Sequence, residues 1–177
     1  LEKNPSNSNQ NPGEGQNWTV FAMDTVMQFD AYGGSANLQE KVKRRVEELE
    51  GELSTTQENS DIFYLNQEKT AKLSDDTRYL MQEALALGAE TDGALDISIY
   101  PVVQSWGFTT GNYRVPSESE RESLLKSVDY RLVGLEADTT SIEPGMMVDL
   151  GGVGKGFTGD EVVKTMKEDG VTSALFS

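Results

Sequence analysis

The segment 148–157 (VDLGGVGKGF) constrains this chain more than any other stretch, because it joins an apolar run to a cluster of glycines. Residues 146–150 predict the end of a buried strand, and the glycines then turn the chain into a helix predicted over 155–169. Glycine lets the backbone approach a ligand closely, and the first N–H groups of a helix favour an anion. Asp149 can bind a ligand or help to hold a metal ion, and Lys155 adds a mobile positive charge. The segment predicts a site for a phosphate-bearing cofactor, with a purely structural glycine turn as the alternative.

Two well-known phosphate-binding patterns match this segment only in part. Residues 154–159 (GKGFTG) fit G-x-G-x-x-G, but a Rossmann fingerprint normally follows the first strand of its domain, and most of this chain precedes it. Its glycines are also expected within the helix start rather than across the turn. The P-loop pattern fails because Gly156, and not Ser or Thr, follows Lys155. Neither pattern identifies the cofactor.

The overall charge limits the classes of partner. The 177 residues carry 30 Asp and Glu against 15 Lys and Arg, a formal net charge of −15, which argues against a nucleic-acid-binding face. A phosphate ligand in so acidic a chain is best accommodated by a divalent cation, which can be the largest charge in such a site. The sequence contains no cysteine and no histidine, so these residues offer no disulfide, no thiol catalyst and no histidine base.

Residues 1–17 (LEKNPSNSNQNPGEGQN) have almost nothing to bury and predict a disordered tether ahead of a folded part at 18–177. Such a tether suits a lipoprotein, and an ordinary frayed terminus is the alternative.

The folded part alternates predicted strands and helices. A long strand is expected at 18–32, interrupted by a bulge or an exposed turn at 23–25. Helical periodicity and capping residues predict helices at 38–53, at 77–91 behind a cap at Asp75 or Asp76, and at 117–126, with a short helical turn at 62–66. Further strands are predicted at 128–133, 141–150 and 171–176.

Two acids between glycines form a second candidate site. Asp92 and Asp96 could act as a carboxylate pair in acid–base chemistry, but an Asp-Gly turn followed by a helix cap is the favoured interpretation. Taken singly, Trp106 and Met23 are better explained as core residues.

Considered together, four segments of the chain resemble the ApbE family of flavin transferases (FAD:protein FMN transferases). The matching residues are Met23-Asp24-Thr25, where the family usually shows Met-Gly-Thr; Ser54-Thr55 through Ser60-Asp61-Ile62 to Leu65-Asn66; Thr91-Asp92-Gly93-Ala94-Leu95-Asp96 with Pro101 and Trp106-Gly107-Phe108; and Asp149-Leu150-Gly151-Gly152-Val153-Gly154-Lys155-Gly156. The last two segments are long and specific, and the resemblance covers residues 18–177.

The resemblance implies an α+β fold of the ApbE type with FAD as substrate and Mg²⁺ as cofactor. Members move FMN from FAD to a Ser or Thr hydroxyl of a target flavoprotein and release AMP, and some mainly hydrolyse FAD to FMN and AMP. Carried over to this sequence, the resemblance implies catalytic roles for Asp149 and Lys155 and a carbonyl ligand to the metal from Gly152. The implied FAD contacts are Met23, Thr56, Ala94, Leu95, Asp96, Asp149 and Lys155.

The chain departs from the family in two respects. Thr56 stands where much of the family has a flavin-stacking Tyr, so stacking there is lost or supplied by another residue. The family's further metal ligands, an Asp and a Thr in a later segment, have no counterpart in these residues, and we therefore expect the chain to be the N-terminal portion of an active parent, without the C-terminal portion of the fold. We expect an extracytoplasmic lipoprotein held at the cell membrane by a lipid anchor. An FAD pyrophosphatase and a flavin-binding lipoprotein without turnover are the alternative functions.

Overall fold

The computed structural model describes residues 15–177 of the chain. Most of the predicted tether at 1–17 therefore lies outside the described residues. The prediction is wrong for residues 15–17, because they form the start of the first strand.

The chain divides into two compact units, and each is described by itself. The first contains the described residues 15–46 together with 160–177, and the second contains residues 47–159. Helices α1 (Leu38–Leu53) and α6 (Gly151–Glu168) each contribute residues to both units. Helices and small antiparallel sheets make up both units, which agrees with the predicted α+β class.

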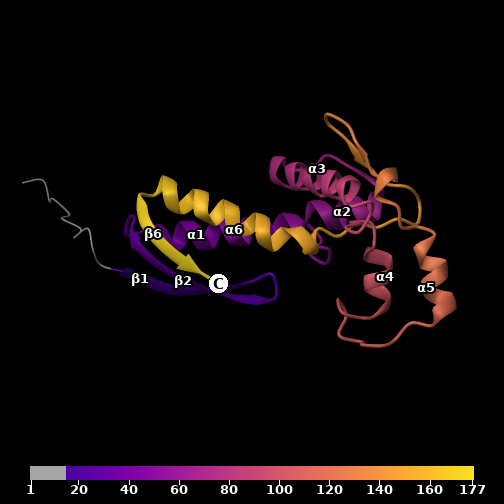
Figure 1. Cartoon of the computed structure of the whole chain (residues 1–177), viewed down its shortest axis with the longest axis horizontal. Helices are drawn as coiled ribbons and strands as arrows, with labels where there is room; N and C mark the ends of the chain where they lie inside the picture. Colours follow the sequence, from indigo (N-terminus) through magenta and orange to yellow (C-terminus); the bar gives the residue numbers. More distant parts are fainter. Residues whose placement is uncertain (1–14) are drawn as a thin grey trace, which may run out of the picture. The chain divides into compact units, whose positions relative to one another are not determined.

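In the first unit, an antiparallel sheet with strand order β1-β2-β6 packs against α1 and α6 (Figure 1). Its strands are β1 (Gly15–Ala22), β2 (Thr25–Gly33) and β6 (Val171–Phe176). The apolar positions of α1 recur every three or four residues, as predicted, and turn one stripe of the helix towards the sheet. The buried core consists of Val20, Ala22, Phe29, Ala31, Leu38, Val42, Val46, Val162 and Met166.

The predicted single strand at 18–32 is in fact a β-hairpin. Met23 and Asp24 form its two-residue turn, with φ values of 51° and 56°, and Ala22 pairs with Thr25 on either side. Positive φ at both central residues is the geometry that two-residue hairpins favour, because it matches the twist of the strands. The polar pair at 23–25 thus marks the exposed turn that was predicted as one of two alternatives.

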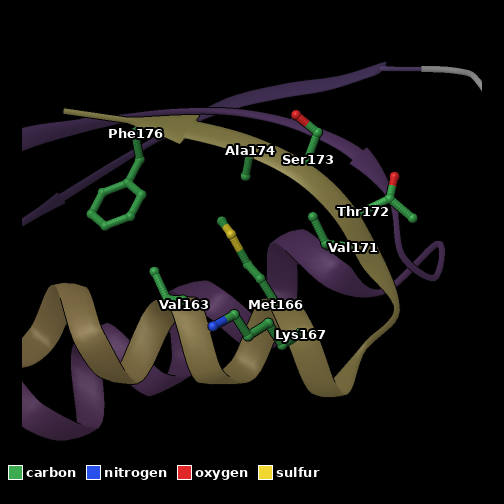
Figure 2. Close-up of a pocket in the computed structure, with 8 residues that line it drawn as sticks. All are labelled: Val163, Met166, Lys167, Val171, Thr172, Ser173, Ala174 and Phe176. Atoms are coloured by element: carbon green, nitrogen blue, oxygen red, sulfur yellow. The ribbon is translucent and has the colours of Figure 1, made fainter.

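A groove of about 220 Å³ lies between α6 and β6 in the first unit (Figure 2). Figure 2 shows Val163 and Met166 rising from α6 towards Ala174 and Phe176 on the strand. None of the predicted site residues lines this groove, and it carries no acidic side chain. We therefore do not assign it to the site.

A hydrogen-bonded cluster fixes the end of α6 to the loop that precedes α1. The buried carboxylate of Asp169 accepts hydrogen bonds from the backbone N–H of Ser35 at 2.7 Å and from its Oγ at 2.9 Å, and it forms an ion pair with Lys41. Burial raises the pKa of Asp169, but the bonds from Lys41 and Ser35 outweigh it and hold the pKa below its usual value. The negative charge of Asp169 is thus part of the folded structure.

The second unit consists mainly of short helices: α2 (Asp61–Glu68), α3 (Asp75–Glu90), α4 (Tyr100–Ser105), α5 (Glu118–Leu125) and the 3₁₀ helix η1 (Tyr130–Leu132). A small sheet adds β3 (Thr70–Ala71), β4 (Gly134–Leu135) and β5 (Thr140–Ser141) in the order β3-β5-β4. Ser60, Ser74 and Ser117 cap α2, α3 and α5 through their hydroxyls. The cap of α3 is therefore Ser74 rather than Asp75 or Asp76.

Two strand predictions in this unit are wrong for local reasons. At 128–133, the side chain of Asp129 accepts a hydrogen bond from the N–H of Arg131 and tightens the segment into the helix η1. At 141–150, only the first residue belongs to a strand, since a turn with Gly145 at φ 91° interrupts the pattern. Beyond the turn, a single parallel bridge joins Met147 to Ile99.

Helix α6 begins at Gly151, four residues before the predicted start. Its first turn is already closed, because the carbonyl of Leu150 accepts from the N–H groups of Val153 and Gly154. Gly151 and Gly152 are therefore helical residues rather than members of a loop. The helix ends at Glu168, one residue before the predicted end, and Gly170 lies just beyond it with φ 88°, as a C-terminal capping glycine does.

Candidate functional site

Asp149 lies at the junction between the extended segment 146–150 and helix α6. Its backbone N–H donates to the carbonyl of Ile97 at 2.8 Å, and its carboxylate oxygen Oδ1 accepts from the N–H of Gly151 at 2.7 Å. The side chain is half-buried, while its neighbours Val148 and Leu150 are fully buried. The protein thus fixes Asp149 at the helix N-terminus and leaves part of its carboxylate available to a ligand.

The glycines allow a ligand close access to this helix end. A Cβ at Gly151 would lie 3.0 Å from Oδ1 of Asp149, so a larger residue there would press on the carboxylate. Gly152 and Gly156 are exposed, as is the side chain of Lys155 one turn into the helix. The N–H groups of Gly151, Val153 and Gly154 already donate within the protein, to Oδ1 of Asp149 and to the carbonyl of Leu150. The positive end of the helix dipole favours an anion at this position, and Lys155 adds a positive charge nearby.

The structure brings the predicted segment 94–96 to the same helix end through Leu95. A Cβ at Gly152 would lie 3.8 Å from Cδ1 of Leu95, so this side chain borders the first turn of α6. Ala94 is exposed beside it. Leu95 and Gly152 thus place the two most specific segments of the sequence next to each other.

Asp96, by contrast, uses both carboxylate oxygens within the protein. Oδ1 accepts from the backbone N–H and the Oγ of Ser98, at 2.8 Å and 2.6 Å, and Oδ2 accepts from the N–H of Tyr130 at 3.1 Å. Asp92 lies in a turn with φ 51°, followed by Gly93. The Asp-Gly turn of the favoured interpretation is confirmed, but the helix cap is wrong, because Ile99 precedes the next helix, α4, and no side chain caps it. Asp96 instead has a structural role through its bonds to Ser98 and Tyr130.

Thr56 is exposed in a polar turn after α1. The Oγ of Ser54 accepts from the N–H groups of Thr56 and Gln57, and it lies 3.2 Å from the hydroxyl of Thr56. Leu53, just before this turn, packs near Gly154, with 3.6 Å between its Cδ1 and a Cβ built at the glycine. The turn thus continues directly from a residue that packs on the start of α6.

Met23 is the one predicted contact outside this unit, because it belongs to the hairpin turn of the first unit. Its φ of 51° is unusual for a long side chain and costs conformational energy. The prediction that Met23 contacts FAD remains a prediction.

The described residues do not fit a complete Mg²⁺ site. Mg²⁺ requires near-octahedral coordination by oxygen atoms. Between residues 15 and 177, no three His, Cys, Asp or Glu side chains group closely enough to hold a metal ion. The carbonyl of Gly152 lies inside α6, where helical carbonyls point along the axis to the N–H four residues later. Among the predicted site residues at this helix end, only Asp149 has a carboxylate that is partly available. We therefore derive no step through a metal.

Asn66 in α2 and Lys69 directly after it hold the segment that carries Asp149. The sequence did not single out either residue for the site. Asn66 is buried and bonds to both backbone groups of Val148. Lys69 donates through Nζ to the carbonyl of Met146 at 2.9 Å, and burial lowers its pKa. Asn66 was part of the resemblance, but nothing in the sequence indicated its partner.

Comparison with known proteins identifies the family of the chain. The sequence model described as "ApbE family" matches residues 23–177. The chain is 26% identical over 174 residues to the FAD:protein FMN transferase of Escherichia coli (strain K12), covering 93% of this chain. It is 29% identical over 147 residues to the enzyme of the same name from Vibrio cholerae serotype O1, covering 80% of this chain.

Solved structures show the same fold. The flavin transferase ApbE from Vibrio cholerae superimposes with a TM-score of 0.85 at 26% identity, covering 94% of this chain and 57% of that one. The ApbE protein of Thermotoga maritima superimposes with a TM-score of 0.84 at 24% identity, covering 93% and 56%. The chain spans about half the length of the curated relatives it matches, 49% and 44% of the two transferases named above.

Proposed function

The chain belongs to the ApbE family, and we propose on this basis that it acts in FMN transfer, as a Mg²⁺-dependent FAD:protein FMN transferase. The substrate would be FAD, and the acceptor a Ser or Thr hydroxyl of a target flavoprotein. The observation that carries the proposal is the position of Asp149 at the glycine-rich N-terminus of α6, with Leu95 beside the same turn.

The proposed reaction exchanges one phosphorus–oxygen bond for another. The acceptor hydroxyl oxygen bonds to the phosphorus of the FMN half of FAD, and the bond from this phosphorus to the bridging pyrophosphate oxygen breaks. AMP leaves with the bridging oxygen. The hydroxyl proton passes to a carboxylate, for which we propose Asp149.

Phosphoryl transfer depends on positioning and on neutralising charge rather than on a histidine base. The positive end of the α6 dipole and the side chain of Lys155 would face the negative pyrophosphate. A Mg²⁺ ion would neutralise further charge and would take oxygen ligands from the substrate phosphates. The described residues offer this ion few oxygen atoms, so we propose the dependence on Mg²⁺ without assigning its ligands.

Flavin transfer tests the proposal directly. The chain, and separately the longer parent of which we expect it to be a portion, are incubated with FAD, Mg²⁺ and an acceptor protein that the Vibrio cholerae transferase flavinylates. That transferase is the positive control. Fluorescence of the acceptor band in a denaturing gel reports FMN transfer, and chromatography reports AMP. Asp149→Asn is compared with Asp160→Asn, which removes an exposed acid elsewhere on the same helix.

Each outcome supports or replaces the proposal. A fluorescent band that EDTA and Asp149→Asn abolish, and that Asp160→Asn leaves intact, supports the transferase. AMP without a band supports an FAD pyrophosphatase, in which water replaces the hydroxyl. Bound FAD that stays intact with Mg²⁺ supports a flavin-binding protein without turnover. If the longer parent neither binds nor converts FAD, all three are overturned.

We also propose an extracytoplasmic location with a lipid anchor. The composition of residues 1–14, rich in Asn, Ser and Pro, supports this proposal, because it is typical of linkers that join a lipid anchor to a folded domain. No helix in the described part of the chain has the length and apolar character that crossing a membrane requires. Fractionation of cells, with labelling of the protein by a radioactive fatty acid, tests both parts of this proposal.

A further inference from the structure

The segment 146–150 carries Asp149, and the segment around Ile97 and Ile99 holds it on one side only, without forming a strand. On that side, Ile99 forms a parallel bridge with Met147, and the carbonyl of Ile97 accepts from the N–H of Asp149 at 2.8 Å. No assigned strand includes Asp149 or its immediate neighbours. A partner other than a strand must therefore bond to the backbone groups on the opposite side of the segment.

The side chain of Asn66 takes this place. Its Oδ1 accepts from the N–H of Val148 at 2.7 Å, and its Nδ2 donates to the carbonyl of Val148 at 2.8 Å. A side-chain amide presents one acceptor and one donor side by side, as a backbone residue does to its partner in a sheet. Asn66 is 3% exposed, so water does not compete for these bonds. Lys69 adds a third bond on the same side, to the carbonyl of Met146.

These contacts fix one peptide group at both ends. The carbonyl of Val148 and the N–H of Asp149 belong to the same planar unit. Asn66 holds the oxygen of this unit at 2.8 Å, and Ile97 holds its N–H at 2.8 Å from the opposite direction. Rotation of the peptide plane would break both bonds together. The direction in which the Asp149 side chain leaves the backbone is therefore set by Asn66 and Ile97.

We propose that Asn66 is a positioning residue, which acts on the site through the backbone of Val148 and holds the Asp149 carboxylate at the N-terminus of α6. The inference rests on the proposed function insofar as Asp149 contacts the flavin nucleotide. Asn66 is buried and its side-chain amide bonds to Val148, so we expect its replacement to change ligand affinity by releasing Asp149.

Asn66→Asp is the sharpest test, because it keeps the shape and the acceptor for the N–H of Val148 but removes the donor to its carbonyl. The matched control is Thr77→Val, which removes the hydroxyl of another fully buried residue of the same unit, bonded to Ser74 and not to the site. Both variants of the whole chain are measured at temperatures chosen for equal fractions of folded protein.

Two measurements separate the inference from the proposed function. Hydrogen exchange at the amide of Asp149 needs no ligand, and we expect it to be faster in Asn66→Asp and unchanged in Thr77→Val. FAD affinity, followed by quenching of flavin fluorescence, should fall on the order of tenfold in Asn66→Asp, as displaced catalytic groups typically cause, and stay constant in the control.

The outcomes are distinct. Exchange at Asp149 that is the same in both variants overturns the inference, as does a loss of FAD affinity of equal size in both. If neither the unaltered chain nor its longer parent binds FAD, the proposed function fails, while the exchange measurement still decides whether Asn66 holds Asp149. If Asn66→Asp does not fold, Lys69→Met is used instead, because it removes the neighbouring bond to the carbonyl of Met146. We expect faster hydrogen exchange at the amides of 146–149 in this variant, and an unchanged rate would count against the inference.

Discussion

Replacing Asp169 by Asn removes one charge from a buried cluster and changes little else in size. In the folded protein, the carboxylate accepts from the N–H and the Oγ of Ser35 at 2.7 Å and 2.9 Å, and it pairs with Lys41. Its side chain is 3% exposed, whereas that of Lys41 is 43% exposed. The lysine can therefore return to water when its partner is lost, but the bonds to Ser35 have no such replacement.

These contacts give the expected size of the effect. Hydrogen bonds to a charged group contribute about 1.5–3 kcal/mol each, and an ion pair with one exposed partner contributes about 0–1 kcal/mol. The two bonds from Ser35 go to the same carboxylate oxygen, Oδ2, so the amide oxygen of Asn can keep both. As bonds to a neutral group they contribute only about 0.5–1.5 kcal/mol each. We expect Asp169→Asn to lower the free energy of unfolding by about 2 kcal/mol at neutral pH.

The pH dependence follows from the lowered pKa of Asp169. An acid whose pKa is lower in the folded state than in the unfolded state stabilises the fold above its unfolded pKa, which is about 3.9 for Asp. This stabilisation is lost as the pH falls through the lower, folded pKa, where the carboxylate takes up a proton. The difference in stability between the wild type and Asp169→Asn should therefore be constant at neutral pH and shrink in acid.

Urea unfolding followed by the fluorescence of Trp18 measures this difference. Trp18 lies in the same unit as Asp169 and stacks on Phe29 at 5.1 Å, and Trp106→Phe removes the second of the two tryptophans in the sequence. Glu161→Gln, which removes a paired acid within α6, controls for the change in net charge. Equal stability of Asp169→Asn and the wild type at neutral pH, or a difference that grows in acid, would refute the assignment.

Three further substitutions test the local geometry. Asp24→Gly should stabilise the protein by about 0.5–1 kcal/mol in thermal unfolding, because glycine adopts the φ of 56° in the hairpin turn without strain. A lower melting temperature of this variant would contradict the prediction. Gly107→Ala should destabilise the protein by more than about 1 kcal/mol, since its φ is 80° and a Cβ would lie 2.0 Å from the carbonyl oxygen of Asn112. Gly111→Ala, with open space around the added Cβ, is the matched control. Asp96→Asn should cost about 1–3 kcal/mol in urea unfolding followed by Trp106 fluorescence, because it weakens three bonds to the carboxylate, and an unchanged midpoint would exclude the structural role.

The two units differ in how much of their fold could be predicted. Helix α1 was predicted with its observed bounds, because five apolar residues at helical spacing determine both its length and its buried face. The strands at 128–133 and 141–150 were not, since both segments are apolar enough for a strand but take their conformation from side chains, such as Asp129, and from a turn at Gly145. Apolar content indicates burial, whereas the backbone conformation depends on the available partners.

The sequence by itself determined the family and the segments that meet at the site, because both follow from residue types in fixed local order. Only the tertiary structure decided what those residues bond to. Asn66 and Val148 are 82 residues apart, and the carboxylate of Asp96 reaches the N–H of Tyr130 across 34 residues. Local spacing determines periodicity and caps, but the partner of a buried polar group is whichever group the folded chain brings within hydrogen-bonding distance, because an unpaired one is costly. For this reason, the sequence indicated Asp149 and only the structure showed what holds it in place.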